Sequence, residues 1–175
     1  MKTFWKIMLI AVLGALVAAL PGFSAAAEGG KLITGSCVFL PDPEESPDNR
    51  SWWNGPDDTL YHQRNELILE YCDFDDDRLD GEVLSTVSWD VFIDFDLYPY
   101  WITGHDHGSL VVTDDAGNIS WTGRYNGFID EFSREYISMI LHGVGEYQTL
   151  QFIGTAFFDY ADPESEGLVI EGYIR

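Results

Sequence analysis

Glycines that interrupt alternating apolar and polar residues are the feature that most constrains the fold of this chain. The alternation is clearest from Trp121 to Gly154 and contains Gly123, Gly127, Gly143, Gly145 and Gly154. A period of two is typical of a β-strand with one buried face, and isolated glycines within it mark bulges, bends or the close approach of another backbone. Repeated on successive strands, the pattern predicts a sheet that curls into a closed barrel.

Strand-like segments separated by turn signals continue through the rest of the chain. The longest runs over residues 83–97, where Val87, Trp89 and Val91 share one face and Asp90 and Asp94 share the other. The predicted strands are residues 31–40, 67–74, 83–97, 110–113, 119–126, 136–142, 150–160 and 167–174. Regularly spaced strands favour a barrel or a sandwich. We predict an all-β protein, a single antiparallel barrel of about eight strands preceded by a helical signal peptide.

The expected domain organisation is a single folded domain over residues 28–175. Residues 28–66 are predicted to be a first strand followed by an irregular acidic and aromatic loop, and residues 67–175 form the main part of the barrel. Residues 49–66 contain Trp52, Trp53 and Tyr61 but no clean period of either kind. We expect this stretch to lie over a barrel mouth.

Residues 1–27 have the layout of a secretory signal peptide. Lys2 and Lys6 precede an unbroken apolar run over residues 7–20, and three alanines end the segment at Ala27. The run of 14 residues reaches only ~21 Å as a helix, which is short of a ~30 Å hydrocarbon core. The sequence therefore predicts a secreted or periplasmic protein that begins near Glu28, with no stable membrane insertion after cleavage.

The charge of the chain excludes some classes of partner. Without Lys2 and Lys6, seven basic residues face 30 acidic ones, a formal charge of −23. Nucleic acids and anionic membrane surfaces require basic patches, so neither is an expected partner. The acidity favours cation binding or adaptation to a salty medium.

Cys37 and Cys72 are the two cysteines of the chain. In an oxidising compartment an even pair predicts one disulfide. It would close a loop of about 35 residues and stabilise the fold by about 3–4 kcal/mol in the chain-entropy model. The alternative, a redox or metal role, requires cysteines closer together.

Aromatic residues are abundant, at 15% of the chain. Such side chains fill a barrel core or line a ligand cavity, and both interpretations stay open here. The residues that we predict to contact a ligand are Trp89, Trp121, Tyr125 and Phe152.

Three groups of polar residues are candidate chemical sites. Asp73, Asp75, Asp77 and Asp80 resemble a calcium-binding loop, but the positions that an EF-hand gives to glycine and glutamate are Arg78 and Leu84. Calcium bound by these four residues is one interpretation, and a solvated acidic turn is the alternative. His105 and His107, with His142 as a third residue, could hold Zn or Cu, and the alternative there is a surface turn that includes Asp106. Asp90, Asp94 and Asp96 lie on the polar face of their strand, and His105 and His107 fall between glycines, so we expect surface positions for both groups. No nucleophile or phosphate-binding motif is present.

Three segments resemble parts of known barrels. They are D-D-R-L-D-G at residues 76–81, W-T-G at 121–123 and G-V-G-E-Y-Q-T-L at 143–150. Over residues 67–175 they resemble allene-oxide-cyclase-like and dirigent-like β-barrels, and most of all a set of uncharacterised exported bacterial proteins. The resemblance implies a small barrel with a central cavity and carries over no catalytic residue.

The function that we predict is non-enzymatic binding of a small apolar or aromatic ligand within the barrel. One alternative is a cyclase or isomerase that holds one conformer of its substrate in a shaped cavity. Another is a surface interaction protein with a calcium-binding acidic loop. A closed cavity lined by Trp and Phe with no buried polar pair would favour binding. Two or more ionisable groups that converge inside the barrel would favour an enzyme, and a filled interior would leave only the surface role.

Overall fold

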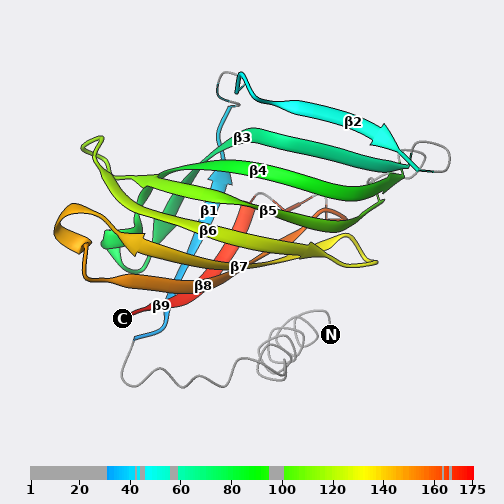
Figure 1. Cartoon of the computed structure of the whole chain (residues 1–175). Helices are drawn as coiled ribbons and strands as arrows, with labels where there is room; N and C mark the ends of the chain where they lie inside the picture. Colours follow the sequence, from blue (N-terminus) through cyan, green and yellow to red (C-terminus); the bar gives the residue numbers. More distant parts are fainter. Residues whose placement is uncertain are drawn as a thin grey trace, which may run out of the picture.

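The computed structural model of the chain is an antiparallel β-barrel of eight strands with a ninth strand outside it (Figure 1). It describes residues 31–41, 43, 46–55, 59–94, 101–162, 164–165 and 167–175. The predicted signal peptide lies outside these residues. Among the described residues there is no α-helix, only two short 3-10 turns, η2 (Asp77–Leu79) and η3 (Gly145–Tyr147).

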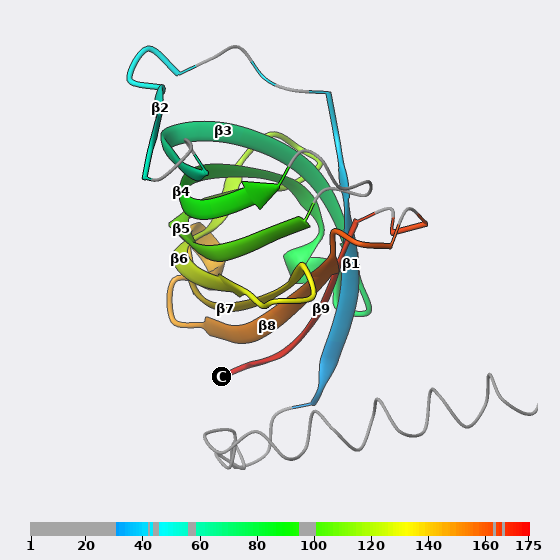
Figure 2. The same ribbon diagram turned by 90° about the vertical axis from the view of Figure 1, so that its right-hand side faces the viewer.

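The strands follow one another around the barrel as a meander. They are β1 (Ile33–Phe39), β2 (Arg50–Asn54), β3 (Leu60–Phe74), β4 (Gly81–Asp94), β5 (Trp101–Thr113), β6 (Ile119–Ile129), β7 (Arg134–Gly143), β8 (Gln151–Asp159) and β9 (Gly167–Ile174). Neighbours from β3 to β9 pair in chain order, and β1 pairs with both β9 and β3. Figure 2 shows the sheet curving round until β1 closes it. The prediction of an eight-stranded barrel is confirmed.

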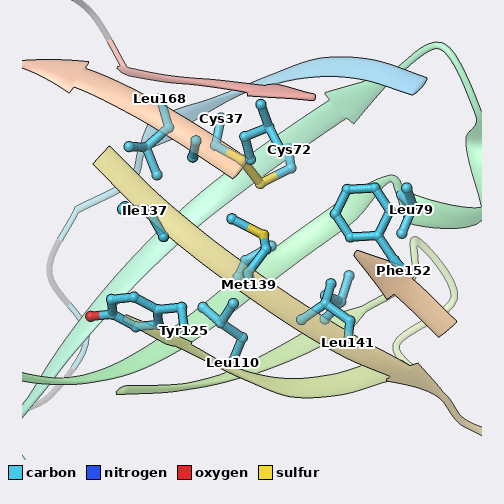
Figure 3. Packing of buried hydrophobic residues seen from close by; sticks show 14 of the residues in the cluster. Cys37, Cys72, Leu79, Leu110, Tyr125, Ile137, Met139, Leu141, Phe152 and Leu168 are labelled. Carbon is cyan, nitrogen blue, oxygen red and sulfur yellow. A yellow bond between two sulfur atoms is a disulfide. The ribbon is translucent and has the colours of Figure 1, made fainter. Parts of the chain in front are cut away.

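The predicted disulfide is present and lies at this closing seam. Cys37 of β1 and Cys72 of β3 are register partners and are joined by a disulfide. Both are 1% exposed, so the bond lies inside the barrel (Figure 3). It therefore cross-links the strand pair that converts an open sheet into a barrel.

The strand β2 and the start of β3 correct the expectation for residues 49–66. This segment was predicted to be irregular, whereas β2 pairs with the first half of β3 along its whole length, from Arg50 opposite Arg64 to Asn54 opposite Leu60. A bulge with Asn65 at a positive φ of 57° separates this half of β3 from the half that belongs to the barrel. Two residues of β3, Arg64 and Asn65, lie opposite the single Ser88 of β4, and this one extra residue moves the alternation along β3 from one face to the other. All five residues of β2 are exposed, so this strand has no alternation to find in the sequence.

Another group comes close to four of the five glycines of residues 121–154, as predicted, while Gly145 has a positive φ in the turn η3 and no group within 4 Å. A Cβ on Gly123 would overlap the carbonyl oxygen of Ile140, and one on Gly143 would overlap the backbone of Tyr147. Phe152 lies across Gly154 and Gly172, where an added Cβ would come within 2.5 Å of its ring. The absence of side chains at these positions lets a small barrel hold large aromatic residues.

Candidate functional site

The barrel encloses a cavity of about 340 Å³. Most of its wall consists of inward-facing aliphatic and aromatic side chains of the barrel strands, such as Val87, Leu110, Ile137 and Met139. Its volume lies at the lower end of the range of small-molecule sites, roughly 300–1,000 Å³. The interior is thus only partly filled by the protein.

One end of the barrel is closed by large buried residues. Leu79 comes from η2, and Phe152 comes from β8 (Figure 3). Trp121 of β6 is fully buried, stacks on Tyr147 at 5.6 Å between ring centroids, and donates its indole N–H to the carbonyl oxygen of Arg78 at 2.5 Å. These contacts tie the β3–β4 and β7–β8 connections together as a floor.

The predicted ligand residues therefore divide into two groups. Trp89, Tyr125 and Phe152 line the cavity. Trp121 belongs to the core and is not part of the cavity wall. In Figure 3 Tyr125 and Phe152 lie at opposite ends of the buried cluster, so the cavity runs along the barrel between them.

Four aromatic rings surround the part of the cavity nearest the β8–β9 connection. Trp89 meets Tyr160 edge-on, Tyr160 meets Phe158, and Phe158 meets Phe39, at centroid distances of 6.5, 4.8 and 5.6 Å. Phe39 is 48% exposed, so this aromatic rim reaches the protein surface.

Three buried carboxyl groups enter the cavity beside the aromatic rim. Glu70 from β3, Asp106 from β5 and Glu135 from β7 are 5%, 3% and 5% exposed. The hydroxyl group of Tyr160 donates a hydrogen bond to Glu135 Oε2 at 2.8 Å. We call Glu70, Asp106 and Glu135, with Tyr125 and Tyr160, the acidic end of the cavity.

Asp106 and Glu135 are hydrogen-bonded to each other. Burial raises the pKa of Asp106, while hydrogen bonds from Glu135 and Tyr125 act in the opposite direction. Burial and the nearby charge of Asp106 raise the pKa of Glu135 well above its usual range. The hydrogen bond between the two carboxyl groups lowers the pKa of Asp106 and raises that of Glu135. Burial also raises the pKa of both tyrosines, which therefore act as hydroxyl donors.

Glu70 has a different environment. Its pKa is raised to about 7 by burial. Glu70 Oε1, Asp106 Oδ1 and the indole nitrogen of Trp89 are buried and have no hydrogen-bond partner among the residues that the structure describes. Buried polar groups nearly always have a partner, so these three atoms mark where a bound molecule or water would form hydrogen bonds.

Gly127 of β6 makes room for the carboxyl pair. A Cβ at this position would overlap Asp106 Oδ1 and come within 2.9 Å of Glu135 Oε1. The predicted glycine pattern thus has a role at the acidic end as well as in the curvature of the sheet.

Sequence reasoning did not identify the three carboxyl groups. Asp106 lies between His105 and His107, for which a surface turn was expected, whereas β5 runs continuously through all three residues. The alternation of the strand was the available signal. Residues two apart on a strand share a face, so Asp106 and Gly108 lie on the same inward face as the apolar Leu110. By the same rule Glu135 shares a face with Ile137, and Glu70 shares one with Cys72.

The acidic turn does not gather its carboxylates around a common point. Asp76 pairs with Arg78 at 2.6 Å, Asp80 accepts the N–H of Phe74, and Asp75 accepts that of Thr34. The predicted calcium ligands are Asp73, Asp75, Asp77 and Asp80. Within the described part of the chain, no group of three or more His, Cys, Asp or Glu side chains is placed to hold a metal ion.

The acidic face of β4 points outward, as expected for Asp90 and Asp94, while Asp96 lies outside the described residues. Asp90 accepts a hydrogen bond from Arg64 at 2.7 Å and lies 2.5 Å from His62 Nδ1. Trp52 of β2 stacks on His62 at 4.9 Å. These contacts attach the outer hairpin to the barrel and do not reach the cavity.

Comparisons with known proteins assign this chain to no family. No protein-family model matches the sequence, and no match was found among curated proteins or solved structures. The described residues contain no helix that is long and apolar enough to cross a membrane. The function must therefore be inferred from the cavity itself.

Proposed function

We propose that this protein binds a small, largely apolar molecule inside its barrel. The observation that carries the proposal is the cavity of about 340 Å³ with an apolar wall and a small group of polar atoms at one end. A concave, mostly apolar site with a few convergent polar groups is the usual form of a small-molecule site.

The ligand would lie along the barrel between Phe152 and Tyr125. Burial of its apolar body supplies affinity at roughly 25 cal/mol per Å², and the polar atoms at the acidic end set its orientation. The aromatic rim would provide the entry, since Phe39 lies both on the cavity wall and at the surface.

A fluorescence titration with the uncharged dye N-phenyl-1-naphthylamine tests the proposal. The dye becomes bright in apolar surroundings, so we expect saturable enhancement with the wild-type protein. The variant Met139→Trp places a larger side chain on the cavity wall and should abolish the enhancement. The matched control is Ile140→Trp, on the same strand but facing outward and 46% exposed.

Unchanged dye binding by Met139→Trp would refute binding inside the barrel. Equal loss in both variants would assign the enhancement to general destabilisation, so the folded state of each variant is checked by circular dichroism. The proposal requires loss in Met139→Trp alone.

The convergence of buried ionisable groups inside the barrel, the feature expected of an enzyme, favours proton-transfer catalysis of the isomerase or cyclase kind as a second candidate. Asp106 and Glu135 are hydrogen-bonded to each other beside two tyrosine hydroxyl groups, and burial raises the pKa of both carboxyl groups. An ionised carboxylate can remove a proton from a carbon atom next to a carbonyl group, and a neighbouring acid or phenol can stabilise the resulting enolate. Both roles are available within this group.

Deuterium exchange tests this second candidate. For cyclohexanone in heavy water, catalysis by the pair predicts exchange of the α-hydrogens that slows about 10²-fold or more in Asp106→Asn, the usual contribution of a general base. Exchange no faster than in buffer alone would eliminate proton transfer and leave the binding proposal intact.

Export remains part of the proposal. The buried Cys37–Cys72 disulfide supports an oxidising compartment, since such bonds are rare in the reducing cytosol. The mature amino terminus of the protein, measured by mass spectrometry of the exported fraction, tests the cleavage expected near Glu28.

A further inference from the structure

We propose, building on ligand binding in the barrel, that the ligand is an amine whose protonated nitrogen binds between Glu70 and Asp106 at the acidic end. Its apolar body would extend towards Phe152. The chemical class is a primary or secondary ammonium ion attached to one aromatic or aliphatic group.

The charges around the cavity support a cationic ligand. Three acidic residues line it, and none of the described lining residues is Lys, Arg or His. A buried carboxylate without a counter-charge is costly, whereas a buried and hydrogen-bonded ion pair recovers much of that cost. An ammonium group would supply the positive charge that the chain itself does not place there.

The available hydrogen-bonding atoms also favour a donor. The tyrosine hydroxyl groups are already engaged, that of Tyr160 with Glu135 and that of Tyr125 with Asp106. Two of the three unpartnered atoms are carboxyl oxygens, on Glu70 and Asp106. When the two carboxyl groups are ionised they only accept hydrogen bonds, so a carbonyl ligand would leave both unpaired, whereas an ammonium group carries up to three N–H donors.

The whole chain favours approach of a cation. Its formal net charge is −21, and charge of one sign concentrates oppositely charged ligands near a site and repels like-charged ones. A carboxylate ligand, such as a fatty acid, would be opposed both by this field and by the acidic end itself.

Binding of an ammonium group would be linked to release of a proton. The groups that face the site are Glu70 of β3, Ser85 and Trp89 of β4, Asp106 of β5, Tyr125 of β6, Glu135 of β7 and Tyr160 after β8. His107, on the same strand as Asp106, also acts on that carboxyl group electrostatically. A nearby cation favours ionised carboxyl groups, so affinity should rise as the pH increases between about 5.5 and about 7.5.

Calorimetry with two probes of similar shape tests the inference. Phenethylamine is protonated at neutral pH, and 2-phenylethanol is its uncharged counterpart. We expect the amine to bind at least about tenfold more tightly, as for a hydrogen bond to a charged group. Titrations in buffers of different ionisation enthalpy should show proton release with the amine and none with the alcohol.

Variants of the same shape but without the charge show which carboxyl groups bind the amine. Glu70→Gln and Asp106→Asn should each reduce amine affinity about tenfold or more while leaving alcohol affinity unchanged. Glu82→Gln, an exposed position on β4, removes the same charge from the surface and should change neither.

The outcomes separate this inference from the proposed function. Equal affinity for both probes, or tighter binding of the alcohol, would overturn the amine assignment while leaving a ligand-binding barrel. Failure of both probes would also overturn it, and the dye titration would then decide independently whether the cavity binds anything. Amine binding unaffected by Glu70→Gln and Asp106→Asn would place the amine elsewhere.

Discussion

Replacing Glu70 with glutamine should change how the stability of the barrel depends on pH. Burial raises the pKa of Glu70 from 4.5 to about 7. A carboxyl group whose pKa is higher in the folded state stabilises the fold while it is protonated. That stabilisation is complete below the unfolded pKa and is lost as the pH rises through the folded pKa. Glutamine has nearly the same shape and does not ionise, so it removes this dependence.

The magnitude follows from the two pKa values. The difference between 4.5 and about 7 corresponds to about 3 kcal/mol of unfolding free energy once the pH exceeds both values. At about pH 5 the raised pKa of Glu70 lowers the unfolding free energy of the wild-type protein by only about 1 kcal/mol. The stability of Glu70→Gln relative to wild type should therefore increase by about 2–3 kcal/mol between about pH 5 and about pH 8.5.

Urea unfolding at both pH values, followed by tryptophan fluorescence, measures this change. Any constant cost of burying an amide cancels in the comparison, because it is the same at each pH. Glu82→Gln serves as the control and should show no such dependence. A stability difference between Glu70→Gln and wild type that stays constant from about pH 5 to about pH 8.5 would refute the assignment of Glu70 as a buried carboxyl with a raised pKa.

Three further changes test the elements that shape the cavity. Removing the disulfide, as Cys37→Ser with Cys72→Ser, should lower the unfolding free energy by about 3–4 kcal/mol; a urea midpoint equal to that of the oxidised wild type would contradict its role at the seam. Gly127→Ala should lower the unfolding free energy by about 1–3 kcal/mol, because the added Cβ would overlap the Asp106 carboxyl group. The control Asn126→Ala, at an exposed position of the same strand, should have an unfolding free energy within about 0.5 kcal/mol of wild type in the same assay. Trp121→Phe should lower the unfolding free energy measured by thermal unfolding by about 1–3 kcal/mol, because the Arg78 carbonyl group loses its indole donor. The control is Trp52→Phe at an exposed position, and equal effects of the two changes would argue against the role of Trp121 in closing this end of the barrel.

The barrel and its disulfide could be predicted from the sequence because both leave periodic or countable signals. The alternation around Trp89 and the glycines from Gly123 to Gly154 directly reflect which side chains face the interior. Two cysteines in a chain with a signal-like start allow only one intramolecular pairing, and the structure has it.

The acidic end could not be predicted with equal ease, because its members come from three separate strands. Glu70, Asp106 and Glu135 lie on β3, β5 and β7, and only closure of the barrel brings them to one cavity. The chain has 30 acidic residues, and among those that the structure describes only Glu70, Asp106 and Glu135 are buried, so an inward carboxyl group has no compositional signal. The outer strand β2 was missed because all five of its residues are exposed, so it has no buried face and no alternation, and the bulge at Asn65 interrupts the alternation of its partner β3.

The most direct test of ligand binding inside the barrel is to locate a bound probe by nuclear magnetic resonance. With methyl-labelled protein and N-phenyl-1-naphthylamine, the account predicts intermolecular nuclear Overhauser effects from the dye to the methyl groups of Met139, Leu110 and Ile137, all on the cavity wall. The outward Ile140 should show none. Contacts to Ile140 without contacts to Met139, or no contacts with any interior methyl group at saturating dye, would contradict the account.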